Sequence, residues 1–148
     1  MLITGIRQTS PGRLTVGLDD GSEVKTTLGV VTDMRLYAGR ELDGEAVNAL
    51  KTASARALAR ERAIEYVSRR AMSRAELKKK LIEKGEDEDT AEYCAAWLAE
   101  HSLIDDERYA AAVARHYAAK GYGAGRVRAE LSRRGIDREL WDGAVGAM

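Results

Sequence analysis

The sequence contains no phenylalanine, only one proline and only one cysteine. A single cysteine, Cys94, excludes an internal disulfide framework and fits a reducing compartment. Without phenylalanine, the core must be filled by Leu, Val, Ile and Ala, with Trp97, Trp141 and six tyrosines as the bulky anchors. No apolar run approaches the roughly 20 residues that span a bilayer. The first residues lack the basic start and apolar stretch of a signal peptide, so we expect a cytoplasmic protein.

Charge of one sign is not in excess either, because the formal net charge of the 148 residues is zero. The charge is nevertheless uneven along the chain. Residues 61–85 have eight basic and four acidic side chains, residues 86–108 have one and nine, and residues 109–135 have six and one. A neutral total argues against attraction to nucleic acid through bulk charge. Alternating basic and acidic stripes suit a partner with a mixed pattern of its own, such as a protein–nucleic-acid assembly.

The first 43 residues have the pattern of a small β-rich domain. Apolar and polar residues alternate from Leu14 to Leu18, which is the period of a half-buried strand. A turn over 19–21 and renewed alternation over 23–28 predict a hairpin, and residues 2–7 predict a further strand before it. A short helix near 30–37 should end at Gly39. We therefore predict a three-stranded meander with one short helix, which needs to pack on the rest of the chain to be stable.

From Asp43 onward the sequence predicts helices. Asp43 is a suitable cap for a helix from Gly44 to about Arg70, with 44–54 acting as a linking helix. Ser73 and Glu76 have the spacing of a capping box at the start of the next helix. That helix should end at Gly85, and Asp87 and Asp105 should each cap a helix after it.

The C-terminal two-thirds of the chain repeats itself at an offset of fifty residues. Matching pairs are Arg70 and Lys120, Leu77 and Val127, Lys78 and Arg128, Leu81 and Leu131, Lys84 and Arg134, Gly85 and Gly135, and Asp87 and Asp137. Repeats of this period indicate stacked modules that present an extended surface to a large partner. We predict a mainly α fold: the β-rich segment, followed by two tandem three-helix repeats over 55–104 and 105–148.

Three strings resemble the RecX family. The first is the run from Ser73 to Leu81 with Lys84-Gly85, the second runs from Leu103 to Ala110, and the third from Lys120 to Ile136. The resemblance covers about residues 60–145 and implies a regulator that binds in the groove of the RecA filament on DNA and limits recombination. Members typically have a third three-helix repeat. Its absence leaves three explanations open: truncation, a naturally short member, or dimerisation.

The candidate binding residues are the basic side chains of the two repeats, which would contact acidic groups of the filament or DNA phosphates. They are Arg70, Arg74, Lys78, Lys79, Lys84, Lys120, Arg126, Arg128, Arg133 and Arg134, with Arg69 and Lys80 in the same basic runs. An isolated lysine usually belongs to a solvated helix face. Recurrence at Lys78 and Arg128, and at Lys84 and Arg134, favours binding there.

Other candidate sites have simpler explanations. Residues 121–125 are glycine-rich but follow a helix and lack the Lys-Ser/Thr ending of a phosphate loop, so we predict a turn. Tyr117 and Tyr122 have the chemistry to stack on bases, although tyrosine at helical spacing usually packs in a core or at its rim. Cys94 lies on an apolar stripe, and His101 and His116 are far apart. We predict no metal, no cofactor and no enzyme activity.

The leading hypothesis is a non-enzymatic regulator of the RecA filament that opposes strand exchange, with weak contact to the backbone of single- or double-stranded DNA and none to membranes. Whether it is a monomer or a dimer stays open. The first alternative is a helix-turn-helix-like module that binds duplex DNA with a steep salt dependence. The second is a general protein-interaction scaffold.

Overall fold

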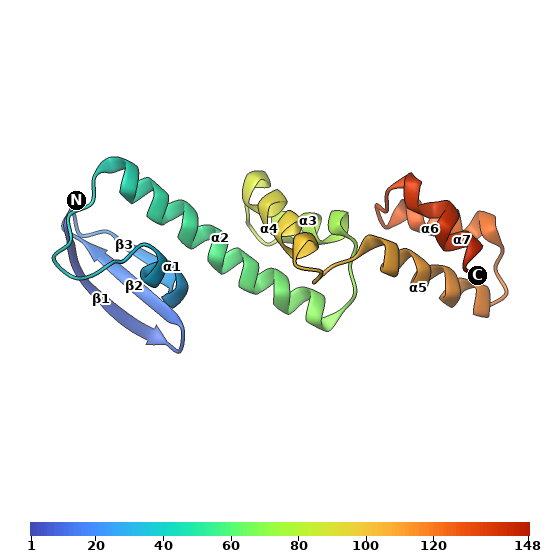
Figure 1. Ribbon diagram of the computed structural model, residues 1–148, viewed down its shortest axis with the longest axis horizontal. Helices are drawn as coiled ribbons and strands as arrows, with labels where there is room; N and C mark the ends of the chain where they lie inside the picture. The colour runs from blue at the N-terminus through green and yellow to red at the C-terminus, as the bar shows by residue number, and fades with distance from the viewer. The chain divides into compact units, whose positions relative to one another are not determined.

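The computed structural model describes residues 1–148 as two compact units, Met1–Glu61 and Arg62–Met148. The first unit contains the sheet and the second the tandem helices (Figure 1). The predicted fold class, mainly α with a three-stranded segment at the N-terminus, is confirmed. The elements are β1 (Ile3–Ser10), β2 (Arg13–Leu18), β3 (Glu23–Thr27), α1 (Leu28–Asp33), α2 (Gly44–Arg69), α3 (Arg74–Glu83), α4 (Glu88–Glu100), α5 (Asp106–Ala119), α6 (Ala124–Arg133), the 3₁₀ helix η1 (Arg138–Leu140) and α7 (Trp141–Gly146).

The first unit is an antiparallel meander, in the order β1-β2-β3, covered by helices. Val16 of β2 pairs with Ile6 of β1 and Val24 of β3, so these side chains share one face of the sheet. That face packs against Val30 of α1 and Leu50 of α2 in one buried core. The period of two in the sequence thus places the apolar residues on the covered face.

The predicted helix near 30–37 is wrong in its position. Helix α1 begins earlier because the side chain of Thr27 accepts a hydrogen bond from the backbone N–H of Val30 at 3.3 Å. It ends earlier because Arg35 has a left-handed backbone, with φ 54°. The Arg40 guanidinium then donates to the carbonyls of Met34 and Arg35, which fixes the turn. Tyr37 consequently lies outside the helix and is 61% exposed.

The long helix α2 begins where the sequence predicts. The Asp43 carboxylate accepts from the Ala46 N–H at 2.7 Å, which satisfies one of the free amides of the first turn. A buried hydrogen bond of 2.7 Å from Ser54 to Thr26 then ties α2 to β3. Both hydroxyls are buried in the core of the first unit, and this hydrogen bond gives each of them the partner that a buried polar group needs.

The first repeat of the second unit confirms the predicted helix ends. Ser73 and Glu76 form the capping box of α3, and Asp87 caps α4 through the Thr90 N–H. Gly85 ends α3 with φ 105°, a conformation that glycine adopts without strain. The fully buried side chains of α3 and α4 include Leu77, Leu81, Ala91, Cys94 and Leu98. Cys94 is therefore a small core residue, as predicted.

The second repeat has the same order of helices as the first, but its third helix differs. Asp105 caps α5, and Ala110, Val113, Val127 and Leu131 form its core with Ile136 and Ala144. Asp137 opens a 3₁₀ turn before α7, where the sequence predicted a regular helix. The Trp141 indole N–H donates to the Ile136 carbonyl at 3.0 Å. None of the helices combines the length and the apolar character needed to cross a bilayer.

Candidate functional site

The two repeats meet at the N-terminus of α3. The Ser73 hydroxyl, besides capping α3, donates to the backbone carbonyl of Arg134 at 2.5 Å. The backbone N–H of Arg74 donates to the Asp106 carboxylate at 2.8 Å. Burial raises the pKa of Asp106, although this hydrogen bond opposes the shift. Two backbone-directed hydrogen bonds therefore fix the end of α6 and the start of α5 beside α3.

Gly135 lies close to α3 at this junction. A Cβ atom at position 135 would lie 2.6 Å from the Cβ of Ala75, and its φ of +72° is left-handed. The equivalent glycine of the first repeat, Gly85, would place its Cβ in open space. Gly135 thus serves both the backbone turn and the contact between repeats, whereas Gly85 serves only the turn.

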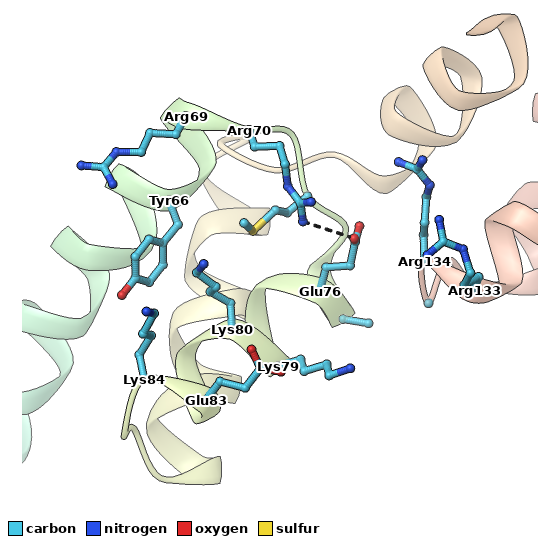
Figure 2. A pocket seen from close by; sticks show the side chains of 13 residues that line it. Tyr66, Arg69, Arg70, Glu76, Lys79, Lys80, Glu83, Lys84, Arg133 and Arg134 are labelled. Atoms are coloured by element: carbon cyan, nitrogen blue, oxygen red, sulfur yellow. Dashed lines mark ion pairs between the residues drawn. The ribbon is translucent and has the colours of Figure 1, made fainter. Parts of the chain in front are cut away.

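A groove of about 750 Å³ opens beside this junction, and basic side chains from both repeats line it (Figure 2). Its walls come from the end of α2, from α3 and from the end of α6. The lining residues are Tyr66, Arg69, Arg70, Met72, Ala75, Glu76, Lys79, Lys80, Glu83, Lys84, Arg133, Arg134 and Gly135. Seven of these are basic and two are acidic, so the groove has a marked positive charge. We call it the basic groove.

Some of the cations that the first repeat contributes to the groove have a partner that compensates their charge, and others do not. Arg70 pairs with Glu76 at 3.6 Å. The Lys80 amino group lies 5.3 Å from the centroid of the Tyr66 ring, a cation–π contact. Figure 2 shows the amino groups of Lys80 and Lys84 near the Tyr66 side chain. Lys79 and Lys84 make no ion pair. The positive charge of Lys79 and Lys84 is therefore available to an anionic ligand.

The cations from the second repeat are held by one buried carboxylate. Glu130, whose side chain is only 7% exposed, accepts from Arg133 and, at 2.8 Å, from Arg134. Arg134 also donates to the Tyr109 hydroxyl at 2.7 Å. Burial alone would lower the pKa of the Arg134 guanidinium, but the hydrogen bonds with Glu130 and Tyr109 raise it. Glu130 therefore positions two arginines at the edge of the basic groove.

This arrangement makes stability depend on pH. The hydrogen bond from Arg133, with support from Arg134 and against the effect of burial, lowers the pKa of Glu130 to about 2. A carboxyl whose pKa is lower in the folded state stabilises the fold above its unfolded pKa and loses this effect as pH falls toward the folded pKa. The loss should therefore extend from about pH 4.5 down to about pH 2.

We expect Glu130→Gln to lower the free energy of unfolding at pH 7 by about 1–2 kcal/mol, since solvent screens the exposed Arg133 side of the pair. The difference from the wild type should shrink toward pH 3, where the wild-type carboxylate begins to protonate. Urea unfolding at both pH values measures it. Glu100→Gln, at an exposed residue without an ion pair, is the control. A difference that stays constant with pH would contradict the role of Glu130.

The structure separates the ten predicted binding residues into two groups. Those in the basic groove are Arg70, Lys79, Lys84, Arg133 and Arg134. Those outside it are Arg74, Lys78, Lys120, Arg126 and Arg128. Of the second group, Arg74 and Lys78 pair with Glu92 at 2.8 and 3.2 Å, and Arg128 lies 3.5 Å from Asp142. Lys120 and Arg126 contact tyrosine rings. Binding by any of these residues stays a prediction.

Some residues that line the groove, and the Glu130 carboxylate that pairs with two of its arginines, were not among the predicted binding residues. Tyr66 and Met72 carry no charge, and their sequence context gives no sign of a groove. Glu130 was hidden because its counterpart at the fifty-residue offset is Lys80, so the repeat gave no hint of a carboxylate. Among the other candidates, His101 stacks on Trp97 with ring centroids 4.0 Å apart. Nowhere do three His, Cys, Asp or Glu side chains come together in a way that could hold a metal ion.

The fold and the basic groove define a tandem three-helix repeat protein in which neighbouring repeats together build one basic surface. Two family models match this chain: "RecX, first three-helix domain" over residues 59–98 and "RecX, second three-helix domain" over 105–145. A crystal structure of "regulatory protein RecX" superposes with a TM-score of 0.82 and 31% identity, covering 98% of this chain and 72% of that one. The chain belongs to the RecX family, which confirms the resemblance found in the sequence.

Other relatives are similar over part of their length. "Regulatory protein RecX" of Xanthomonas axonopodis pv. citri is 40% identical over 87 residues, which is 59% of this chain and 54% of the relative. That of Pseudomonas entomophila is 37% identical over 79 residues, or 53% and 51%. RecX from Lactobacillus salivarius has a TM-score of 0.58 at 26% identity, over 62% of this chain and 60% of that structure. The chain thus spans about half the length of the curated relatives it matches.

Proposed function

We propose that this protein is a non-enzymatic regulator that binds the RecA filament on DNA through the basic groove and opposes strand exchange. The observation that carries the proposal is that the groove is built jointly by the two repeats, with Lys79 and Lys84 from one and Arg133 and Arg134 from the other. A surface that exists only when repeats are stacked suits a partner that is itself extended and repetitive.

Family membership supports the choice of partner. The relatives are regulatory proteins by name, and the sequence resemblance implies that the regulated protein is the RecA recombinase. A nucleoprotein filament offers both phosphates and carboxylates, and either would complement the unpaired lysines of the groove. Occupation of the filament groove would exclude a second DNA strand, and this exclusion is the mechanism by which binding would oppose exchange.

The test adds the protein to RecA assembled on single-stranded DNA and follows both ATP hydrolysis and strand exchange. We expect both to fall as the protein approaches the concentration of RecA. Removal of the unpaired charges at Lys79 and Lys84 should shift that concentration upward. Unchanged hydrolysis and unchanged exchange at a stoichiometric amount of protein would contradict the proposal.

The positive charge of the groove also favours one alternative, a module that binds duplex DNA directly. This alternative predicts tight binding to free duplex that weakens steeply with salt. The proposal predicts instead that free duplex binds weakly at the salt concentration at which the filament binds tightly. Fluorescence anisotropy of a labelled duplex over a salt series separates the two.

A further inference from the structure

One tyrosine hydroxyl at the junction interacts with charged groups of both repeats. Tyr109 lies in the first turn of α5, and its hydroxyl accepts a hydrogen bond of 2.7 Å from the Arg134 guanidinium at the end of α6. Burial raises the pKa of the Tyr109 hydroxyl, Arg134 opposes this shift, and a hydrogen bond with the Glu76 carboxylate of α3 adds to it. The hydroxyl therefore stands between a cation of the second repeat and a carboxylate of the first.

The ring and the hydroxyl of Tyr109 make different contacts. The ring packs against the hydrophobic core of the second repeat, and the Arg134 guanidinium lies 5.6 Å from the ring centroid. The hydroxyl adds the polar contacts, since one O–H group can donate to a carboxylate while its oxygen accepts from a guanidinium. Replacing Tyr109 by phenylalanine thus removes the polar link between the repeats and keeps the packing.

The first repeat has no equivalent of this link. At the fifty-residue offset, Tyr109 corresponds to Ala59, which is fully buried, and Arg134 corresponds to Lys84, which makes no ion pair. The three-helix unit therefore folds without a tyrosine–arginine contact at these positions. Because the hydroxyl of Tyr109 faces the neighbouring repeat, its polar contacts belong to the junction and not to the core of one repeat.

The link restrains a cation that lines the basic groove. Glu76 pairs with Arg70 at 3.6 Å on the side of the first repeat, and Arg134 lies on the side of the second (Figure 2). Glu130 accepts from the Arg134 Nε at 2.8 Å, and Tyr109 accepts from its Nη1 at 2.7 Å. A guanidinium fixed at two nitrogens has already lost most of its rotational freedom, so less entropy is lost when an anionic partner contacts it.

We infer that Tyr109 is a positioning residue of the basic groove, whose hydroxyl holds Arg134 in the orientation that the partner contacts. Tyr109 does not itself line the groove, so it acts through Arg134. The inference rests on the proposed function, because it concerns the same groove and the same partner. It adds that the groove is preorganised by a side chain outside it, which joins the counter-charges of the two repeats.

The test measures inhibition of RecA-dependent ATP hydrolysis on single-stranded DNA by the full chain. Tyr109→Phe should raise the half-inhibitory concentration about fivefold, since Arg134 would then be ordered only on binding. The loss of one hydrogen bond leaves the folded state populated, so a purely structural role of the hydroxyl predicts an unchanged concentration. Tyr122→Phe, at a 43% exposed tyrosine of the same repeat outside the groove, is the matched control and should have no effect.

A double-mutant cycle tests whether the hydroxyl acts through Arg134. Arg134→Lys keeps the positive charge, but an ammonium lacks the planar fork that donates to Glu130 and Tyr109 together. In the Arg134→Lys background, Tyr109→Phe should therefore change the half-inhibitory concentration by less than about twofold. An equal effect of Tyr109→Phe in the two backgrounds would overturn the inference.

A readout without RecA is the NMR spectrum of the arginine side-chain nitrogens. The Nη resonances of Arg134 should be separate in the wild type, where rotation of the guanidinium is restricted, and should merge in Tyr109→Phe. Unchanged resonances would overturn the inference, as would altered resonances with unchanged inhibition. A wild-type protein that does not inhibit RecA would instead contradict the proposed function, and the inference with it, so the two failures are distinguishable.

Discussion

Replacing Lys79 and Lys84 together by glutamine should raise the concentration needed to inhibit RecA by about tenfold or more. Both lysines line the basic groove and lack an ion pair. Their removal therefore breaks no interaction of the fold but takes away the charge that is free to contact the filament. The measurement is the half-inhibitory concentration in RecA-dependent ATP hydrolysis on single-stranded DNA.

The repeat supplies a matched control that removes the same net charge. Lys78 is adjacent to Lys79 on α3 but pairs with Glu88 and Glu92, and Arg128 pairs with Asp142. The double variant Lys78→Gln/Arg128→Gln should stay within about twofold of the wild type, because paired charges outside the groove contribute little. Equal shifts in the two double variants would mean that inhibition follows net charge and not the groove.

Gly135→Ala should destabilise the second unit by about 2–4 kcal/mol, while Gly85→Ala should cost about 1–2 kcal/mol. Both substitutions place a side chain on a left-handed backbone, but only position 135 adds a contact of 2.6 Å with Ala75. Urea unfolding of the two variants measures the difference. Because Arg133 and Arg134 immediately precede Gly135, the same change should also displace them from the groove.

A double-mutant cycle isolates the contact between repeats from the backbone strain. Adding Ala75→Gly to Gly135→Ala removes the Cβ that the new side chain meets, so part of the lost stability should return. Ala75→Gly alone should be mildly destabilising, since glycine is a poorer helix residue. Strictly additive effects of the two substitutions would show that Ala75 and Gly135 do not press on each other.

The elements whose ends depend on nearby residues were predictable from the sequence. The caps at Asp43, Ser73, Asp87 and Asp105 act within three residues, and Gly85 acts through its own backbone, so local spacing suffices to locate them. The start of helix α1 was placed too late because the alternating pattern over 23–28 was assigned to a strand, although the Thr27 cap also acts within three residues. Its end was misplaced because the turn after α1 depends on the Arg40 side chain, which donates to the Met34 and Arg35 carbonyls.

Only half of the predicted binding residues line the basic groove, for a related reason. The fifty-residue offset picked out recurring charge at Lys78 and Arg128, yet each of these cations pairs with an acidic side chain of its own repeat. Lys79 and Arg133 have no such correspondence, but the stacking of repeats brings both into one groove. Which cations meet depends on the junction at Gly135, a tertiary contact that periodicity cannot locate.

Affinity for the RecA filament, compared with affinity for the same DNA without protein, tests the central claim most directly. The measurement is biolayer interferometry with a single-stranded DNA immobilised either bare or coated by RecA, at one salt concentration. Binding through the basic groove to the filament predicts at least about tenfold tighter association with the coated strand. Equal or tighter binding to the bare strand would contradict it.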